Sequence, residues 1–219
     1  HTIFQIFYLL RQGYLIDEMR KTKSLSRHKY DLNFRKIINI NDLRVLIVGY
    51  GNIGSKVGDT LIKMGAEVTG IASRERVSKQ GIRIFTISKL KKLVKSHDLV
   101  LALLPYDIKL EGIFRKEIFD NMRKNSYFIN NGRSSHVVEK DLCEALSNKL
   151  AGAAIDVFDQ NLSSGFSNII NKKNLLITPH IGAVDPSYWS HQITLFEYNL
   201  KCFLDNKIIK MKNICNKGF

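Results

Sequence analysis

Arg44-Val45-Leu46-Ile47-Val48-Gly49-Tyr50-Gly51-Asn52-Ile53-Gly54 is the stretch that decides the fold of this 219-residue chain. Apart from Arg44, its first five residues form a short apolar run that ends at a glycine, which is typical of a buried parallel strand. The G-x-G-x-x-G spacing and the helical pattern that follows it predict a phosphate-binding turn between a strand and a helix. Such a turn binds the pyrophosphate of a dinucleotide, and three turn glycines without a ligand are the alternative. The cofactor-binding residues expected here are Gly49, Gly51, Asn52, Ile53 and Gly54.

Strands and helices alternate through most of the chain. Further strands are expected at 67–71, 82–85, 99–104, 127–130, 153–157 and 175–177, with helices near 53–64, 90–94, 114–122 and 137–148. This alternation predicts an α/β Rossmann fold with a doubly wound parallel sheet. Residues 2–22 are expected to form one helix, 23–43 an irregular arm, and 186–204 a final amphipathic helix.

The composition narrows the class of partner. The net charge is +14, but the lysines are spread along the chain. This even distribution favours a general bias in amino-acid composition, together with solubility, as the origin of the charge over a dedicated binding surface. Without a basic stripe and interleaved aromatic residues, no nucleic-acid partner is expected. No apolar run is long enough to cross a membrane. A positive surface still favours an anionic substrate or a phosphorylated cofactor.

Three cysteines, Cys143, Cys202 and Cys215, occur without a C-x-x-C spacing. This odd number suggests neither a disulfide framework nor a zinc site, so no metal is expected and a reducing, cytoplasmic location is predicted. The chain starts with His1 and lacks an initiator methionine, which predicts that it begins inside a longer protein.

The end of the second strand bears on the choice of cofactor. An acid that binds the ribose of NAD usually lies there, but this position holds Ala72, followed by Ser73, Arg74 and Arg76. Ser73 can donate a hydrogen bond to a 2′-phosphate, and Arg74 or Arg76 can pair with it. The segment therefore favours NADP over NAD. A solvated surface arginine pair with mixed cofactor use is the alternative.

Several ordered motifs resemble one family, the D-isomer-specific 2-hydroxyacid dehydrogenases. The resemblance runs from His1 to about Ala183 and includes the apolar start at 1–11, Leu103-Leu104-Pro105 with Gly112-Ile113, and the segments at 128–134, 151–158 and 177–182. It implies hydride transfer between NAD(P)H and a small 2-oxo or 2-hydroxy acid. The Ser-Arg-x-Arg segment is similar to that of NADPH-using glyoxylate and hydroxypyruvate reductases.

The resemblance also implies roles for individual residues. Arg133 would bind the substrate carboxylate and carbonyl, since a guanidinium matches a carboxylate bidentately. His180 would be the acid in reduction and the base in oxidation. Asp156 would help to hold the nicotinamide carboxamide, with a capping role as the alternative. Leu104 and Pro105 would flank the nicotinamide ribose, although Pro105 could simply terminate the strand. Four further histidines, His28, His97, His136 and His191, match no catalytic position and are expected to face solvent.

Two departures from the family matter. Most members have a glutamate that pairs with the catalytic histidine where this chain has Asn161, and an amide can orient an imidazole but supplies no charge. Asn161 is therefore the third expected catalytic residue, and it also supports a second hypothesis, a non-catalytic dinucleotide-binding sensor or scaffold. Ser134 replaces the usual glycine after the arginine.

The second departure is length, because most of the family's substrate domain precedes its interdomain helix. The resemblance therefore implies a dinucleotide-binding domain over 1–184, including an interdomain helix and a dimer arm, and a returning helix and tail over 185–219. This gives an interdomain helix at each end. A homodimer is expected, since family members pair through the first region.

Overall fold

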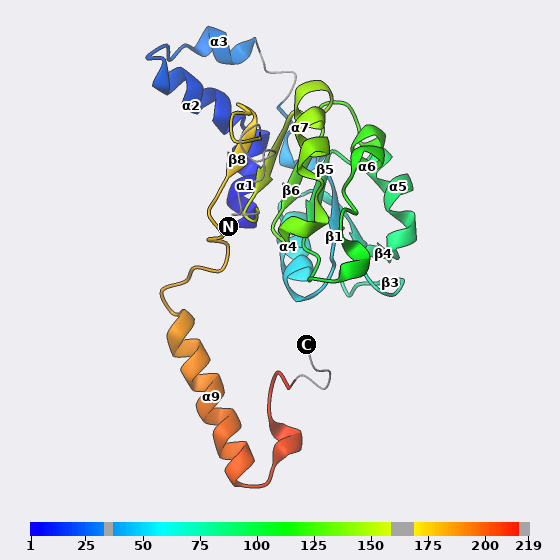
Figure 1. The fold of residues 1–219 in the computed structure, drawn as a ribbon, viewed down its shortest axis with the longest axis vertical. Coiled ribbons are helices and arrows are strands. Elements are labelled where there is room, and N and C mark those ends of the chain that lie inside the picture. Colours follow the sequence, from blue (N-terminus) through cyan, green and yellow to red (C-terminus); the bar gives the residue numbers. More distant parts are fainter. Residues whose placement is uncertain (33–36, 159–168, 215–219) are drawn as a thin grey trace. The chain divides into compact units, whose positions relative to one another are not determined.

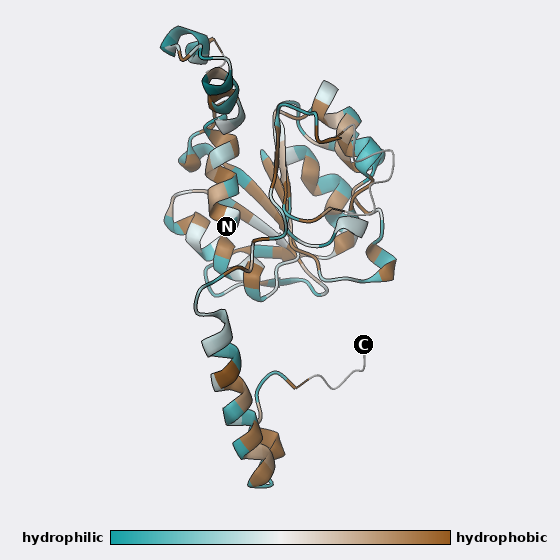
Figure 2. Ribbon diagram, turned by 60° about the vertical axis from the view of Figure 1, so that its left-hand side comes forward, coloured by the Kyte–Doolittle hydropathy of each residue, from teal (hydrophilic) through white to brown (hydrophobic). Residues whose placement is uncertain are grey.

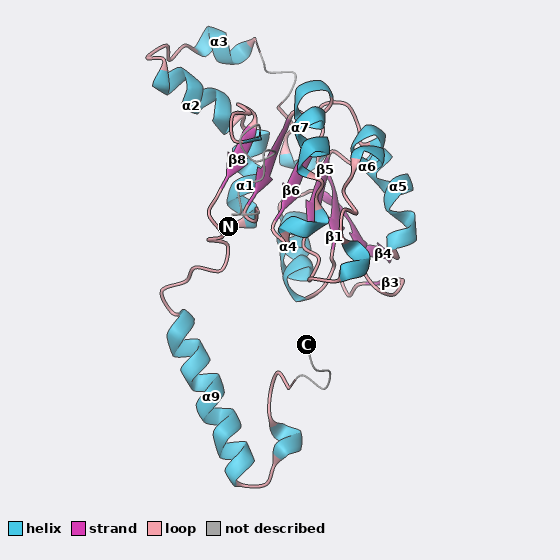
Figure 3. Ribbon diagram, in the orientation of Figure 1, coloured by secondary structure: helices cyan, strands magenta, loops and turns pink. Residues whose placement is uncertain are grey.

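The strand that begins at Arg44 lies in the middle of a mostly parallel sheet, which has eight strands in the described part of the chain. The computed structural model describes residues 1–32, 37–158 and 169–214. Across the sheet the order is β3 (Arg76–Val77), β4 (Arg83–Phe85), β2 (Glu67–Ile71), β1 (Arg44–Val48), β5 (Leu99–Ala102), β6 (Tyr127–Asn130), β7 (Gly152–Ile155) and β8 (Leu175–Ile177). Among the described strands, only β3 and β4 pair in an antiparallel direction. Figure 3 shows the strands of the sheet with the helices packed around them. The chain order reverses on either side of β1, so the predicted doubly wound fold is confirmed.

Helices cover both faces of the sheet (Figure 1). One hydrophobic cluster joins the sheet to α5 (Leu90–Leu93), α6 (Lys116–Asn121) and α7 (Glu139–Asn148). The other joins it to α1 (Thr2–Leu10) and α4 (Asn52–Lys63). Alternate residues of β1 belong to the two clusters, because successive side chains of a strand point to opposite faces of the sheet. Both faces of β1 are thus buried, as its uninterrupted apolar sequence predicts.

The predicted single helix over 2–22 is wrong, because the structure has two helices there. Helix α1 ends at Leu10 and α2 (Gly13–Lys21) begins after Gln12, whose φ of 51° lies in the left-handed region. At Gly13, a Cβ would lie 2.3 Å from the ring of Tyr8. The chain therefore turns back over Tyr8 at a glycine, while the apolar pattern continues through the break and conceals it.

Several short elements were not predicted. The arm expected to be irregular contains α3 (Arg27–Asp31), which the Ser26 side chain caps by accepting a hydrogen bond from the Lys29 amide. It also contains a 3-10 helix, Ile40–Asp42. The strand β3 is only two residues long, which is too short for an alternating pattern to reveal.

The structure divides the chain into two units, His1–Gly182 and Ala183–Phe219. The second unit holds α9 (Tyr188–Leu204), on which hydrophobic and hydrophilic residues alternate (Figure 2). Its tail folds back onto the helix, since the Tyr198 hydroxyl donates to the Lys210 carbonyl and Asn199 bonds the backbone of Lys212. The assignment of 185–219 to a separate domain stays a prediction. No helix among the described residues is long and apolar enough to span a membrane.

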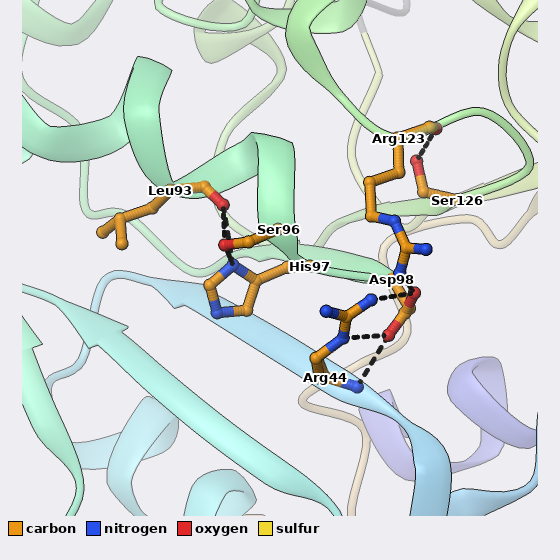
Figure 4. Close-up of polar contacts among 7 residues, drawn as sticks. All are labelled: Arg44, Leu93, Ser96, His97, Asp98, Arg123 and Ser126. Atoms are coloured by element: carbon orange, nitrogen blue, oxygen red, sulfur yellow. Dashed lines mark hydrogen bonds and ion pairs between the residues drawn. The ribbon is translucent and has the colours of Figure 1, made fainter.

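An ion-pair network ties the strands together at the edge where they begin (Figure 4). The carboxylate of Asp98 accepts hydrogen bonds from the backbone amide and the guanidinium of Arg44, at 3.0 to 3.2 Å, and from the guanidinium of Arg123. The side chain of Asp98 is 12% exposed. Asp98 thereby joins the start of β1 to the start of β5 and to the turn before β6.

Candidate cofactor and substrate site

The glycine turn after β1 has three different steric requirements. Gly49 has a φ of 107°, and a Cβ there would lie 2.5 Å from the backbone carbon of Leu103. A Cβ on Gly54 would lie 2.4 Å from the carbonyl oxygen of Gly49, so helix and strand approach closely. At Gly51, by contrast, a Cβ would meet no atom within 4 Å. The open space at Gly51 is where a pyrophosphate can approach the backbone.

Helix α4 starts at this turn and can bind an anion there. Its N-cap is Gly51, and the first amides of a helix have no partner within the helix. Asn52 and Ile53 are exposed in this first turn, and the Ile53 side chain is 64% exposed. The predicted phosphate-binding residues therefore lie together on the accessible end of a 12-residue helix.

A cavity of about 510 Å³ opens directly beside the turn. It is lined by the residues after β1 (49–51), after β2 (71–73) and after β5 (103–107), together with Arg76. The carboxyl ends of neighbouring parallel strands meet here, at the point where the chain order reverses. Ligands of doubly wound sheets bind at this place. The cavity, the open space at Gly51 and the helix amides together fit a dinucleotide.

Of the residues predicted to bind a 2′-phosphate, Ser73 and Arg76 line the cavity, and Arg74 does not. Arg76 is held across the glycine turn, since its guanidinium donates to the carbonyl of Tyr50 at 3.0 Å and to that of Arg74 at 3.3 Å. All three residues are exposed. The antiparallel strand β3, which the sequence did not reveal, is what brings Arg76 back to the cavity.

Leu104 and Pro105 line the same cavity from the end of β5. The backbone of Leu104 packs on Gly132, where a Cβ would lie 2.8 Å from the Leu104 carbonyl oxygen. Beneath this contact lies His136, which is fully buried, and burial lowers its pKa below the ordinary value. The prediction that His136 faces solvent is therefore wrong. It packs where the loop after β5 meets the loop after β6.

Arg133 follows β6 in a loop that a buried asparagine shapes. The side chain of Asn130 donates to the Arg133 carbonyl at 2.9 Å and accepts from the Gly132 amide at 3.0 Å. Arg133 is exposed, and its guanidinium donates to the Gly132 carbonyl at 2.8 Å. The remaining donors of the guanidinium are thus available to a carboxylate from solution.

Asp156, at the end of β7, is an anchor for the segment that carries His180. Its buried carboxylate accepts hydrogen bonds from the Thr178 hydroxyl at 2.5 Å and from the amides of Ile181 and Gly182 at 3.0 and 2.8 Å. The ring of His1 lies 3.3 Å away. These bonds surround His180, which is exposed and has a φ of 56°. Asp156 therefore fixes an unfavourable backbone conformation that presents the imidazole to solvent.

The structure places Arg133, Asp156 and His180 after the neighbouring strands β6, β7 and β8, and so on the same edge of the sheet as the glycine turn. Asn161 lies outside the described residues. The described residues contain no group of three or more His, Cys, Asp or Glu that could hold a metal ion.

Tyr50, the second residue of the glycine motif, is a structural part of the site that sequence reasoning missed. Tyr50 is 2% exposed, and its side chain fills a slot between α4 and β2. A Cβ on Gly58 would lie 2.9 Å from its hydroxyl oxygen, and a Cβ on Gly70 would lie 2.8 Å from its ring. Burial raises the pKa of the Tyr50 hydroxyl. The glycines inside a helix and a strand were the available signal.

The fold and the turn define a dinucleotide-binding α/β protein. Residues 3–182 match the family model described as D-isomer specific 2-hydroxyacid dehydrogenase, NAD binding domain. The chain belongs to this family, and the predicted family membership is confirmed.

Named relatives agree with this assignment. The chain is 30% identical over 186 residues to glyoxylate/hydroxypyruvate reductase A of Escherichia fergusonii, covering 84% of this chain and 57% of that protein. It is 27% identical to hydroxypyruvate reductase of Blautia hydrogenotrophica, covering 81% of this chain and 55% of the relative. It therefore spans little more than half the length of these relatives.

A solved structure extends the comparison. An NADPH-dependent glyoxylate/hydroxypyruvate reductase from Sinorhizobium meliloti, in complex with NADP and sulfate, is similar to the chain with a TM-score of 0.81 and 26% identity. The match covers 98% of this chain and 66% of that one.

Proposed function

We propose that this chain is the cofactor-binding part of an NADP-dependent reductase of small 2-oxo acids, of the glyoxylate or hydroxypyruvate type. The observation that carries the proposal is the convergence of the glycine turn, Arg133 and His180 on one edge of the sheet. The relatives named as glyoxylate/hydroxypyruvate reductases support the same substrate class.

In this proposal each residue has one task. The bound dinucleotide supplies the hydride. Arg133 binds the substrate carboxylate through its planar fork, which also fixes the direction of the adjacent carbonyl. His180 donates a proton to the carbonyl oxygen during reduction and takes it back during oxidation. Asn161 orients the His180 imidazole, and Asp156 keeps the backbone of His180 in place. A cytoplasmic location stays a prediction from the cysteine content.

A homodimer is the proposed assembly. Exposed apolar side chains on α1 and α2, such as Phe4 at 54% and Ile16 at 42% exposure, support an interface on these two helices.

Turnover is the test of the enzymatic proposal. We expect the 219-residue chain, or a longer polypeptide that contains it, to bind NADPH, and the longer one to oxidise it with glyoxylate or hydroxypyruvate. Removing the charge in Arg133→Gln should lower kcat/KM by roughly a hundredfold, because hydrogen bonds between charged groups are the strongest available to a small acid. Absorbance of NADPH measures the rate. Tight NADPH binding without turnover of any 2-oxo acid would instead support the non-catalytic sensor that the amide of Asn161 suggests.

The choice of cofactor is tested by the two arginines after β2. We expect Arg76→Ala to raise the Kd for NADPH about tenfold to a hundredfold, since it removes a cation that lines the cavity. Arg74→Ala is the matched control and should have the smaller effect. The Kd for NADH, measured by fluorescence titration, should stay within about threefold in both variants. An equal loss for NADH and NADPH would mean that Arg76 only supports the glycine turn through the Tyr50 carbonyl.

A further inference from the structure

A second cavity, of about 520 Å³, lies at the opposite edge of the sheet from the glycine turn. The parallel strands β1, β2 and β4 begin here, and they contribute Arg44, Glu67 and Arg83 to its wall. The cofactor cavity lies where these strands end. The two cavities therefore face different edges of one sheet, and the second takes no part in the proposed function.

The wall of this second cavity is strongly cationic. Besides Arg44, its fixed cations are Arg83, Lys89 and Lys92, and Glu67 is the only carboxylate among the described residues that line it. The charge of Arg44 is already compensated by Asp98. Within the described residues, the side chains of the other three cations form no ion pair. Positive charge thus exceeds negative charge in a concave site, which concentrates anions.

His97 gives the cavity a buried polar group. The ring lines the cavity although the residue is only 5% exposed, so the prediction that it faces solvent is wrong. Its Nδ1 lies 2.7 Å from the Leu93 carbonyl oxygen (Figure 4). A carbonyl only accepts, so Nδ1 carries the hydrogen. In the neutral ring Nε2 is then an acceptor, and it has no hydrogen-bond partner in the described parts of the chain.

Protonation would turn this nitrogen into a donor for an anion. Burial lowers the pKa of His97 below its ordinary value, and Arg44 acts in the same direction. The Leu93 carbonyl, Glu67 and Asp98 act in the opposite direction. The ring is therefore neutral at neutral pH in the free chain. A bound anion opposes the burial effect and favours the imidazolium.

We propose that this cavity, at the edge where the strands begin, binds a small molecule that carries a phosphomonoester or a similar tetrahedral dianion. Arg83, Lys89 and Lys92 hold the dianion, and Nε2 of His97 donates to it after taking up a proton. Phe85 and Leu93, which also line the cavity, contact the apolar part of the ligand. Binding is therefore coupled to proton uptake by His97, and it strengthens as the pH falls for as long as the ligand itself stays a dianion.

Sulfate is the probe for the test, because it stays a dianion throughout the titration of histidine. We expect saturable changes in the His97 imidazole resonances on adding sulfate to the 219-residue chain, in the presence and in the absence of NADPH. Lys92→Gln should weaken sulfate binding about fivefold. Lys91→Gln is the matched control, because it removes the same charge from the neighbouring residue. The Lys91 ammonium forms an ion pair with Glu117 and does not line the cavity.

The pH dependence distinguishes a built site from a general charge effect. As the pH falls from about 7 through the lowered pKa of His97, the affinity for sulfate should rise roughly tenfold, and His97→Gln should remove this rise. Saturating sulfate should also raise the pKa of His97 in the unaltered chain, a readout that requires no variant to fold. Equal losses in the Lys91 and Lys92 variants, or a His97 pKa that sulfate leaves unchanged, would overturn the proposal.

Discussion

The variant Gly49→Ala should lose about 3 to 5 kcal/mol of unfolding free energy, whereas Gly51→Ala should lose less than about 1 kcal/mol. At Gly49 the φ of 107° excludes most side chains, and a Cβ would lie 2.5 and 2.6 Å from the carbonyl carbon and oxygen of Leu103. Those atoms belong to the backbone at the end of β5, which cannot move without disturbing the sheet. At Gly51 the φ is −96° and the added methyl meets no atom.

For cofactor binding by the folded protein, Gly51→Ala is the more damaging of the two substitutions. The methyl of Gly51→Ala points into the space that the pyrophosphate needs, so the Kd for NADPH should rise at least about tenfold, because charge-assisted hydrogen bonds to the helix amides are lengthened or lost. Urea unfolding followed by circular dichroism gives the stability, and fluorescence titration gives the Kd. A Gly51→Ala variant that binds NADPH normally would show that the pyrophosphate lies elsewhere.

The two glycines also show what the sequence could predict. The spacing of the motif is local and predicts the turn, whereas the contact of Gly49 with the backbone of Leu103 lies outside the motif. The parallel sheet, the helix after the turn and the edge at which ligands bind were predicted for the same reason. The periodicity of a buried strand and of an amphipathic helix is also a local property.

Contacts between distant segments were not predictable in this way. His97 and His136 have no local pattern that marks them as buried, and only packing against other segments excludes water from them. The break at Gln12 was hidden because α1 and α2 continue one apolar pattern. Arg76 was proposed alongside Arg74, and only the short antiparallel strand β3 distinguishes the two positions.

Asp156 shows how a role implied by resemblance can differ from the one that the structure supports. The resemblance assigns it to the nicotinamide. In the structure, three hydrogen bonds to the segment 178–182 and the contact with His1 use its carboxylate. A carboxylate that already accepts this many bonds has little capacity left for a ligand amide.

Asp156→Ala is therefore expected to damage catalysis much more than cofactor binding. It leaves the buried Thr178 hydroxyl and the amides of Ile181 and Gly182 without this acceptor, which should cost about 1 to 3 kcal/mol of unfolding free energy. Once released, His180 should leave its left-handed conformation, and kcat should fall at least about a hundredfold in a polypeptide that turns over. Asp156→Asn keeps one acceptor oxygen, so its stability and its kcat should lie between those of the unaltered protein and those of Asp156→Ala.

The Kd for NADPH separates the two roles of Asp156. If Asp156 is an anchor, this Kd should change by less than about threefold in both variants, while kcat falls. A carboxylate that contacts the nicotinamide would raise the Kd instead, with little loss of stability. Asp31→Ala is the control, because it removes an exposed carboxylate paired with Arg27 and should change neither quantity by a measurable amount. Because Asp156, in the loop after β7, holds the left-handed backbone at His180, we expect proton donation by His180 to require the Asp156 carboxylate.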